Sequence, residues 1–207
     1  FYLRWFTPEI EMDLCGHATL ATAYCLKNHL NFKNDSVKFD SMSGELIVKY
    51  KGDYLQMDFP HRKPKKSELP QNIMDSLSIK PSEILKSRDY VLVYENEDQI
   101  KNIQIDKELF DKKNIDPGGV VITSLGNHSD FVSRYFVPQC SFFEDPVTGS
   151  THCSLVPYWS ERLKKNKLKS IQLSERGGEM ICEDVGNRVL IDGKAVTYSE
   201  GYVHLKY

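Results

Sequence analysis

The stretch Phe143-Glu-Asp-Pro-Val-Thr-Gly-Ser-Thr-His-Cys153 decides the fold that we expect for the rest of the chain. Two carboxylates open it, Pro146 and Gly149 make a sharp turn, and a helical run follows. Ser150 stands at the boundary between turn and helix, where a hydroxyl can cap free backbone N–H groups. Those groups and the helix dipole favour an anion, and Asp145 lies beside them. A carboxylate next to an anion site can move protons on an acidic substrate; a capped surface helix with acidic flanks is the alternative.

A similar pattern occurs near the N-terminus. Arg4-Trp-Phe-Thr-Pro8 precedes Asp13 and a turn at Gly16, and Arg134-Tyr-Phe-Val-Pro138 leads into the stretch quoted above. Each copy has the order Arg-aromatic-Phe-x-Pro, an aspartate, a glycine turn and a helical run. The spacing from arginine to glycine is 12 in the first copy and 15 in the second. Two such units predict two similar halves that face one another, with chance similarity of a strand-turn-helix as the alternative.

Composition and charge are those of an ordinary globular chain. Of its 207 residues, 40% are hydrophobic and 27% are charged, and the net charge of −2 favours neither nucleic acid nor an anionic membrane as a partner. No apolar run is as long as a membrane span. The five cysteines are scattered, with no Cys-x-x-Cys pair and no metal-like spacing. Such a set fits a reducing cytosol better than a disulfide framework, so we expect a cytoplasmic location and no metal.

The order of predicted elements indicates an α+β fold rather than a doubly wound parallel sheet, because strands come mostly in hairpin order. An alanine-rich helix over 17–29 is expected to be central, and a basic stretch over 61–68 is expected to be a connector. Further helices are predicted over 71–77, 97–102, 106–112 and 150–165. Strands are predicted over 1–6, 37–39, 46–50, 54–59, 89–94, 119–123, 131–137, 170–173, 179–183, 188–191, 195–199 and 202–205. We divide the chain into an incomplete N-terminal half, 1–63 plus about 196–207, and a C-terminal half, 64–195.

The two motifs together resemble a known family. Asp13-Leu-Cys-Gly-His-Ala-Thr-Leu-Ala21 and Glu144-Asp-Pro-Val-Thr-Gly-Ser-Thr-His-Cys153 are similar to those of the PhzF family, phenazine biosynthesis-like proteins related to diaminopimelate epimerase. The likeness extends to Gln172-Leu-Ser-Glu-Arg-Gly-Gly178. It implies two pseudo-symmetric halves, each a mixed sheet or barrel around a central helix. The site is then expected between the halves, with both helix N-termini pointing inward.

The resemblance also implies an activity, a cofactor-independent isomerase that shifts a proton within a small carboxylate substrate. Gly16 and His17 match the family's first active-site turn, and Asp145, Gly149 and Ser150 match the second. We interpret His17 as a donor to the substrate carboxylate or an acid/base partner. Asp145 is expected to orient His17 or to take part in proton transfer. Ser150 and the backbone at both glycines are expected to hold the substrate anion.

Two departures from the family pattern leave alternatives open. In the related epimerases, one thiol from each half exchanges the proton; Cys15 falls near the first such place, but Thr148-Gly149-Ser150 offers no second thiol. A thiol-dependent racemase is therefore an alternative. The family's principal acid/base glutamate lies before the position of Phe1, so we expect the chain to be a truncated form with an exposed sheet edge. A catalytically impaired binding or interaction protein is a second alternative, and a homodimer is one expectation for the oligomeric state.

Overall fold

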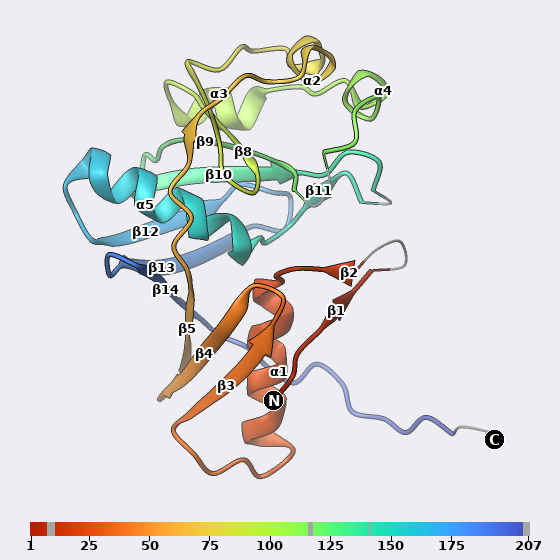
Figure 1. Ribbon diagram of the computed structural model, residues 1–207, viewed down its shortest axis with the longest axis vertical. Coiled ribbons are helices and arrows are strands. Elements are labelled where there is room, and N and C mark those ends of the chain that lie inside the picture. The colour runs from red at the N-terminus through yellow and green to blue at the C-terminus, as the bar shows by residue number, and fades with distance from the viewer. Residues whose placement is uncertain (8–10, 116–117, 141, 205–207) are drawn as a thin grey trace.

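The computed structural model describes residues 1–7, 11–115, 118–140 and 142–204, which form a mixed sheet with few helices (Figure 1). Its elements in chain order are β1 (Trp5–Phe6), β2 (Glu11–Met12), α1 (Gly16–Asn28), β3 (Ser36–Ser41), β4 (Gly44–Lys51), β5 (Tyr54–Pro60), β6 (Lys65–Lys66), α2 (Gln71–Ser76), β7 (Glu83–Lys86), β8 (Tyr90–Val93), α3 (Glu97–Asn102), α4 (Lys107–Phe110), β9 (Val120–Leu125), β10 (Phe131–Phe136), β11 (Glu144–Asp145), the 3₁₀ turn η1 (Gly149–Thr151), α5 (His152–Leu163), β12 (Lys167–Gln172), β13 (Gly178–Asp184) and β14 (Arg188–Gly193).

The first part of the chain wraps a three-stranded meander around α1. Strands β3, β4 and β5 pair antiparallel in sequence order. Val37 and Phe39 are buried on β3 while Lys38 between them is exposed, so one face of the meander lies against the core. Ala23 of α1 is fully buried, and its carbonyl accepts a hydrogen bond of 2.8 Å from the Tyr50 hydroxyl. The small side chains of α1 allow the predicted close packing against the strands.

The second part is a longer sheet with helices on both sides (Figure 1). Strands β8 and β9, and likewise β10 and β12, pair parallel, whereas the other neighbours in this part pair antiparallel. Helices α2, α3 and α4 cover one face, where Ile73, Ile100 and Phe110 join a buried cluster with β8, β9 and β10. Helix α5 covers the other face, and Trp159 is 2% exposed with its indole N–H donating to the Thr123 hydroxyl at 3.0 Å. Trp159 is therefore a core residue.

Strands β5 and β14 join the two parts into one sheet. They pair antiparallel from Arg188 opposite Pro60 to Gly193 opposite Leu55. The larger hydrophobic cluster also crosses this junction, because it contains residues of β3–β5 and of α5. The division into 1–63 plus 196–207 and 64–195 stays a prediction, and the hydrogen-bonded sheet continues across it.

Two short hairpins with matching ion pairs precede the two long helices. In β1–β2, the Arg4 guanidinium donates to both carboxylate oxygens of Glu11 at 2.7 and 2.8 Å. In β10–β11, Arg134 donates to Glu144 at 2.8 Å in both bonds. In each hairpin the guanidinium also lies over the ring of the phenylalanine two residues later, at 4.7 and 5.0 Å from its centroid. The two segments thus share side-chain contacts as well as sequence.

The aspartates of the two motifs do not occupy matching places, contrary to the sequence alignment above. Asp145 lies in β11 opposite Tyr135, and the residue of β2 in that place, opposite Trp5, is Met12. Asp13 follows β2, and its carboxylate bonds to side chains outside the hairpin. The matching acids are the glutamates of the ion pairs, each five residues before the helix-starting glycine.

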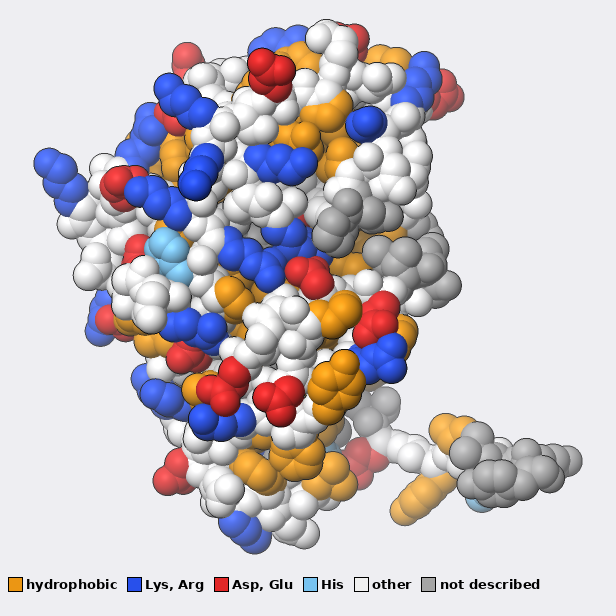
Figure 2. All heavy atoms as spheres, in the orientation of Figure 1, with side chains coloured by type: hydrophobic (Ala, Val, Ile, Leu, Met, Phe, Trp, Pro, Cys, Tyr) orange, Lys and Arg blue, Asp and Glu red, His pale blue; other side chains and the backbone are white. Residues whose placement is uncertain are grey.

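Several predicted strands are shorter than expected or absent. Residues 1–6 form a strand only at β1, with an isolated bridge from Tyr2 to Asp40. Residues 195–204 form no strand, and residue 205 lies outside the described chain. Thr197 and Glu200 of this segment lie 2.8 and 3.0 Å from the His29 ring at the end of α1. Its apolar side chains extend away from the body (Figure 2), and Tyr198 is 99% exposed. A strand needs a neighbour to satisfy its backbone, and none of the described strands pairs with this segment.

Candidate functional site

Gly16 and Gly149 contact each other where the first turns of α1 and η1 meet. A Cβ atom built on Gly16 would lie 2.9 Å from the Cα of Gly149, and one built on Gly149 would lie 3.3 Å from the Cα of Gly16. Both values are below an ordinary carbon–carbon contact of about 3.5–4.0 Å. The close approach therefore requires glycine at the first position and favours it at the second. It brings together the N-termini of two helices from distant parts of the chain.

A cavity of about 990 Å³ opens at this contact. All five residues singled out from the sequence line it: Gly16, His17, Asp145, Gly149 and Ser150. Both predicted turns thus face the same space. The outer walls come from the β1–β2 hairpin, from the loop after β10 and from the loop between β12 and β13.

The helix N-termini at the cavity have free backbone N–H groups. Cys15 is the N-cap of α1 and Thr148 is the N-cap of η1, which continues directly into α5; neither side chain caps its helix. Neither first turn contains an acidic residue. The N–H groups and the helix dipoles can therefore bind an anion. Ser150 is not the cap that the sequence predicted, because it lies inside the first turn, and its hydroxyl has no hydrogen bond with the described residues.

His17 is the basic side chain at the first turn, and it is exposed to the cavity. The sulfur of Cys15 lies 3.5 Å from Nε2 and 3.8 Å from Nδ1 of the ring. The Cys15 thiol, as hydrogen-bond partner, raises the pKa of His17 above 6.5. Burial opposes this rise, whereas the charge of Asp145 and a hydrogen bond with the Val147 backbone add to it. A raised pKa keeps a larger share of the imidazole protonated near neutral pH.

Asp145 is the acidic side chain of the cavity, and it is half-buried. Burial raises its pKa above 3.8, while a 2.7 Å hydrogen bond from the Thr148 hydroxyl and the charge of His17 oppose the rise. No hydrogen bond joins Asp145 to His17 among the described residues; the two interact through their charges. The pKa values of both groups are therefore set by the same small region, as in sites that transfer protons.

Thr148 and Gln172 hold Asp145 in place, a role that the sequence did not predict. Gln172 is 1% exposed on β12; its amide N–H donates to the Asp145 carbonyl at 2.6 Å, and its amide oxygen accepts from the Thr148 backbone at 2.7 Å. Thr148 lies three residues after Asp145, a spacing at which side chains bond across a turn. Gln172 is 27 residues away, and no local pattern connects the two.

A second network ties the turn before α1 to the longer sheet. Arg88, in the turn between β7 and β8, has its side chain 6% exposed and donates to Asp13 at 2.8 Å and to Asp89 at 2.9 Å. Arg62 approaches the other oxygen of Asp13 at 3.4 Å, and the Tyr135 hydroxyl donates to Asp89 at 2.9 Å. These contacts position the Asp13 end of the first turn. The sequence did not predict these contacts, because ion pairs between residues so far apart in the chain leave no local pattern.

The cysteines near the site differ in burial and in whether they line the cavity. Cys15 and Cys140 both line the cavity, the latter from the loop after β10, and the sequence interpretation gave Cys140 no role. Thr148 occupies the position before Gly149 that Cys15 occupies before Gly16, so the second turn has no thiol there. Cys153 is buried, and burial raises its pKa to about 12, so it serves packing.

The described residues contain no group of three or more His, Cys, Asp or Glu side chains that could hold a metal ion. In the same part of the chain, no helix has the length and apolar character needed to cross a membrane. His152 is buried in α5 and bonded to the Ser170 hydroxyl at 2.8 Å.

Solved structures and known sequences show proteins that are similar to this chain in fold and sequence. A probable proline racemase from Agrobacterium radiobacter K84 shares the fold, with a TM-score of 0.62 at 12% identity over 99% of this chain and 72% of that chain. A PhzF family protein from Enterococcus faecalis has a TM-score of 0.88 at 41% identity, over 99% of this chain and 78% of that chain. A Pseudomonas aeruginosa protein named as an uncharacterized isomerase is 43% identical over 99% of this chain and 78% of its own length. The family described as phenazine biosynthesis-like protein, PhzC-PhzF, matches residues 1–201, so the chain belongs to that family.

Proposed function

We propose that this protein is a cofactor-independent isomerase of the PhzF type, which shifts a proton within a small carboxylate substrate. The observation that carries the proposal is the convergence of His17 and Asp145, from two distant turns, on one cavity beside two uncapped helix N-termini. The names of the relatives as isomerases support it. The matching hairpins support our inference that the cavity lies between two similar halves.

In this proposal the substrate carboxylate binds at the glycine contact. The N–H groups of Gly16 and Gly149 and the free hydroxyl of Ser150 donate to it. Asp145, with its raised pKa, accepts a proton from the substrate, and protonated His17 returns one at another position. Each turnover leaves Asp145 protonated and His17 neutral, and proton exchange with solvent water restores both groups.

Proton exchange in deuterated water tests the proposal. The purified chain is incubated with a panel of small carboxylic acids and with no added cofactor, and deuterium incorporation is followed by NMR. We expect Asp145→Asn and His17→Asn each to slow exchange by about 10²–10⁴-fold. Asp53→Asn and His128→Asn, matched changes outside the cavity lining, are expected to leave it unchanged.

The pH dependence gives a second readout of the same groups. Because the pKa of Asp145 is raised above 3.8, the rate is expected to increase with pH above that value as the base ionises. Because the pKa of His17 is raised above 6.5, the rate is expected to fall above that value as the acid loses its proton. A rate that rises with pH throughout, without an alkaline limb, would contradict His17 as the acid.

The thiol-dependent racemase predicts a different pattern. Cys15→Ser and Cys140→Ser would then abolish exchange, whereas Asp145→Asn would leave most of it. We expect the opposite, with the Cys15 change altering mainly the alkaline limb through its contact with His17. Ligand binding without exchange in any acid would instead favour the binding-protein alternative.

A further inference from the structure

Basic side chains outnumber acidic ones along the cavity. Asp145 is the one carboxylate among its described lining residues, and the cations are Arg4, Arg88, Arg176 and Lys194. Acidic side chains outside the cavity lining neutralise two of these cations. Glu11 pairs with Arg4, and two aspartates pair with Arg88. Besides that of His17, the positive charge available to a ligand is therefore that of the other two cations.

Arg176 differs from Lys194 in having no partner among the residues that the structure describes. The Lys194 ammonium group lies 4.5 Å from the centroid of the Tyr54 ring, a cation–π contact that occupies it. Arg176 is exposed and has no ion pair, hydrogen bond or ring contact with the described residues. A guanidinium group at the wall of a cavity, with all of its N–H groups free, is suited to bidentate binding of a carboxylate.

The loop that carries Arg176 is braced against the site. The Ser174 hydroxyl donates to the Pro146 carbonyl at 2.7 Å and accepts from the Gly177 backbone at 3.1 Å. Gly177 has a φ of +70°, which favours glycine, and completes the tight turn. A Cβ atom on Gly178 would lie 2.9 Å from the Val147 side chain, so the loop packs directly on the turn that holds Asp145. The backbone position of Arg176 is therefore set before any ligand binds.

We propose that Arg176 binds a second acidic group of the substrate, so that the site takes a small organic acid with two carboxylates. One carboxylate binds at the Gly16–Gly149 contact, and the other binds the Arg176 guanidinium at the cavity wall. This inference rests on the proposed function, because it places the reacting end of the substrate at the same helix N-termini. It adds the substrate class, which the proposed chemistry leaves open.

Calorimetric titration with matched acids tests the inference. Succinate, glutarate and adipate are each compared with the monocarboxylate of the same carbon number. We expect at least one dicarboxylate to bind about tenfold more tightly than its match, the effect of one charge-assisted contact at an exposed site. Arg176→Gln is expected to remove this difference without changing monocarboxylate affinity, and Arg176→Lys to keep part of it.

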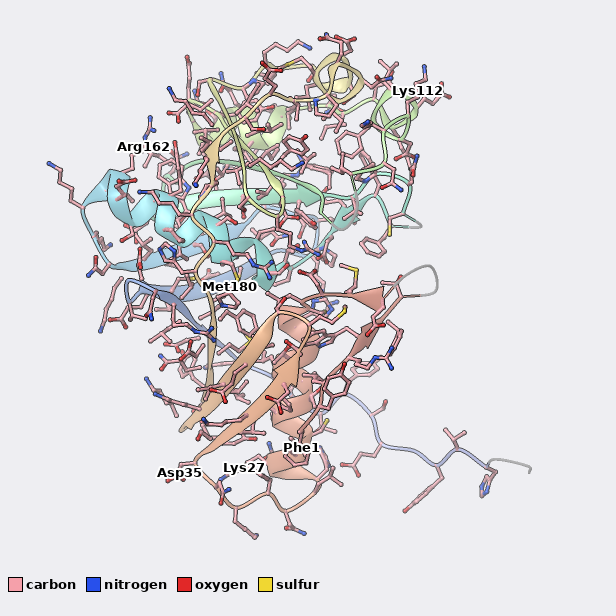
Figure 3. The ribbon with its side chains drawn as sticks, in the orientation of Figure 1. Phe1, Lys27, Asp35, Lys112, Arg162 and Met180 are labelled. Carbon is pink, nitrogen blue, oxygen red and sulfur yellow. The ribbon has the colours of Figure 1, made fainter. Side chains whose placement is uncertain are left out.

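Two further variants separate this inference from the function on which it rests. Arg162→Gln removes the same charge at the far end of α5 from the cavity (Figure 3) and is expected to keep the tenfold difference. Ser150→Ala is expected to weaken both classes of acid. If Arg176→Gln keeps the difference, or if dicarboxylates bind no more tightly than their matches, the role of Arg176 is wrong while the carboxylate site stands. If neither class binds the unaltered protein, the proposed function fails together with the inference.

Discussion

Replacing Gly16 by alanine tests the close contact between the two helix N-termini. The new Cβ would lie 2.9 Å from the Cα and 3.3 Å from the carbonyl carbon of Gly149. Both neighbours are backbone atoms, so no side chain can rotate away. The two turns must separate by about 0.5–1 Å to restore a contact of about 3.5–4.0 Å.

The cost follows from two opposing effects. Inserting a methyl group into a close-packed site costs about 1–3 kcal/mol. Alanine also lowers the entropy of the unfolded chain, which returns about 0.4–1 kcal/mol. We therefore expect Gly16→Ala to lower the free energy of unfolding by about 1–2 kcal/mol, and the melting temperature by about 2–8 °C for a chain of this size.

Urea and thermal unfolding measure this cost, and carboxylate binding measures its effect on the site. Gly149→Ala, whose Cβ would meet the Cα of Gly16 at 3.3 Å, is expected to be milder. Gly201→Ala is the matched control, because nothing lies within 4 Å of the added atom. If Gly16→Ala is as stable as Gly201→Ala and binds carboxylates like the unaltered protein, the two turns are not in the contact described above.

Two further predictions concern side chains that stabilise the fold around the site. Burial lowers the pKa of His152 from 6.5 to about 4, so its contribution to the free energy of unfolding is present above pH 6.5 and lost as pH falls to about 4. Unfolding measured at several pH values should show the unaltered protein losing about 3 kcal/mol across this range, a loss that His152→Asn lacks. The same pH dependence in both proteins would contradict this prediction. Asp13→Ala leaves Arg88 with Asp89 alone, and we expect it to cost about 2–3 kcal/mol in urea unfolding, after discounting for the part of Asp13 that is exposed. Glu45→Ala, at an exposed ion pair, should cost at most about 1 kcal/mol, and similar costs for the two changes would be the contrary result.

The elements that could be predicted from the sequence have a local cause. The meander over residues 36–60 follows from alternating apolar side chains and two glycine turns. Helix α3 occupies 97–102 as predicted, and Asp106 caps α4 through its bond to the Leu109 backbone. The residues of the candidate site could be proposed from the sequence because each turn carries its own glycine and polar side chain and both turns resemble PhzF family motifs.

The elements that could not be predicted depend on distant partners. Residues 195–199 have the composition of a strand, but the described strands leave them unpaired. Asp13 and Asp145 look equivalent in sequence, yet pairing in the two hairpins puts Met12 in the place that corresponds to Asp145. The contacts of Gln172 with the Asp145 turn cross more than 20 residues. Local patterns do not encode such contacts.

The sequence by itself determined the two glycine turns, the helices that begin at them and the side chains that each turn carries. Only the tertiary structure decided that Gly16 and Gly149 touch, that Arg88 secures the first turn and that Arg176 lines the cavity with no partner among the described residues. The physical reason is the separation along the chain over which each kind of interaction acts. Backbone preferences and capping act over a few residues, whereas close packing and charge pairing act between whichever surfaces the folded chain brings together.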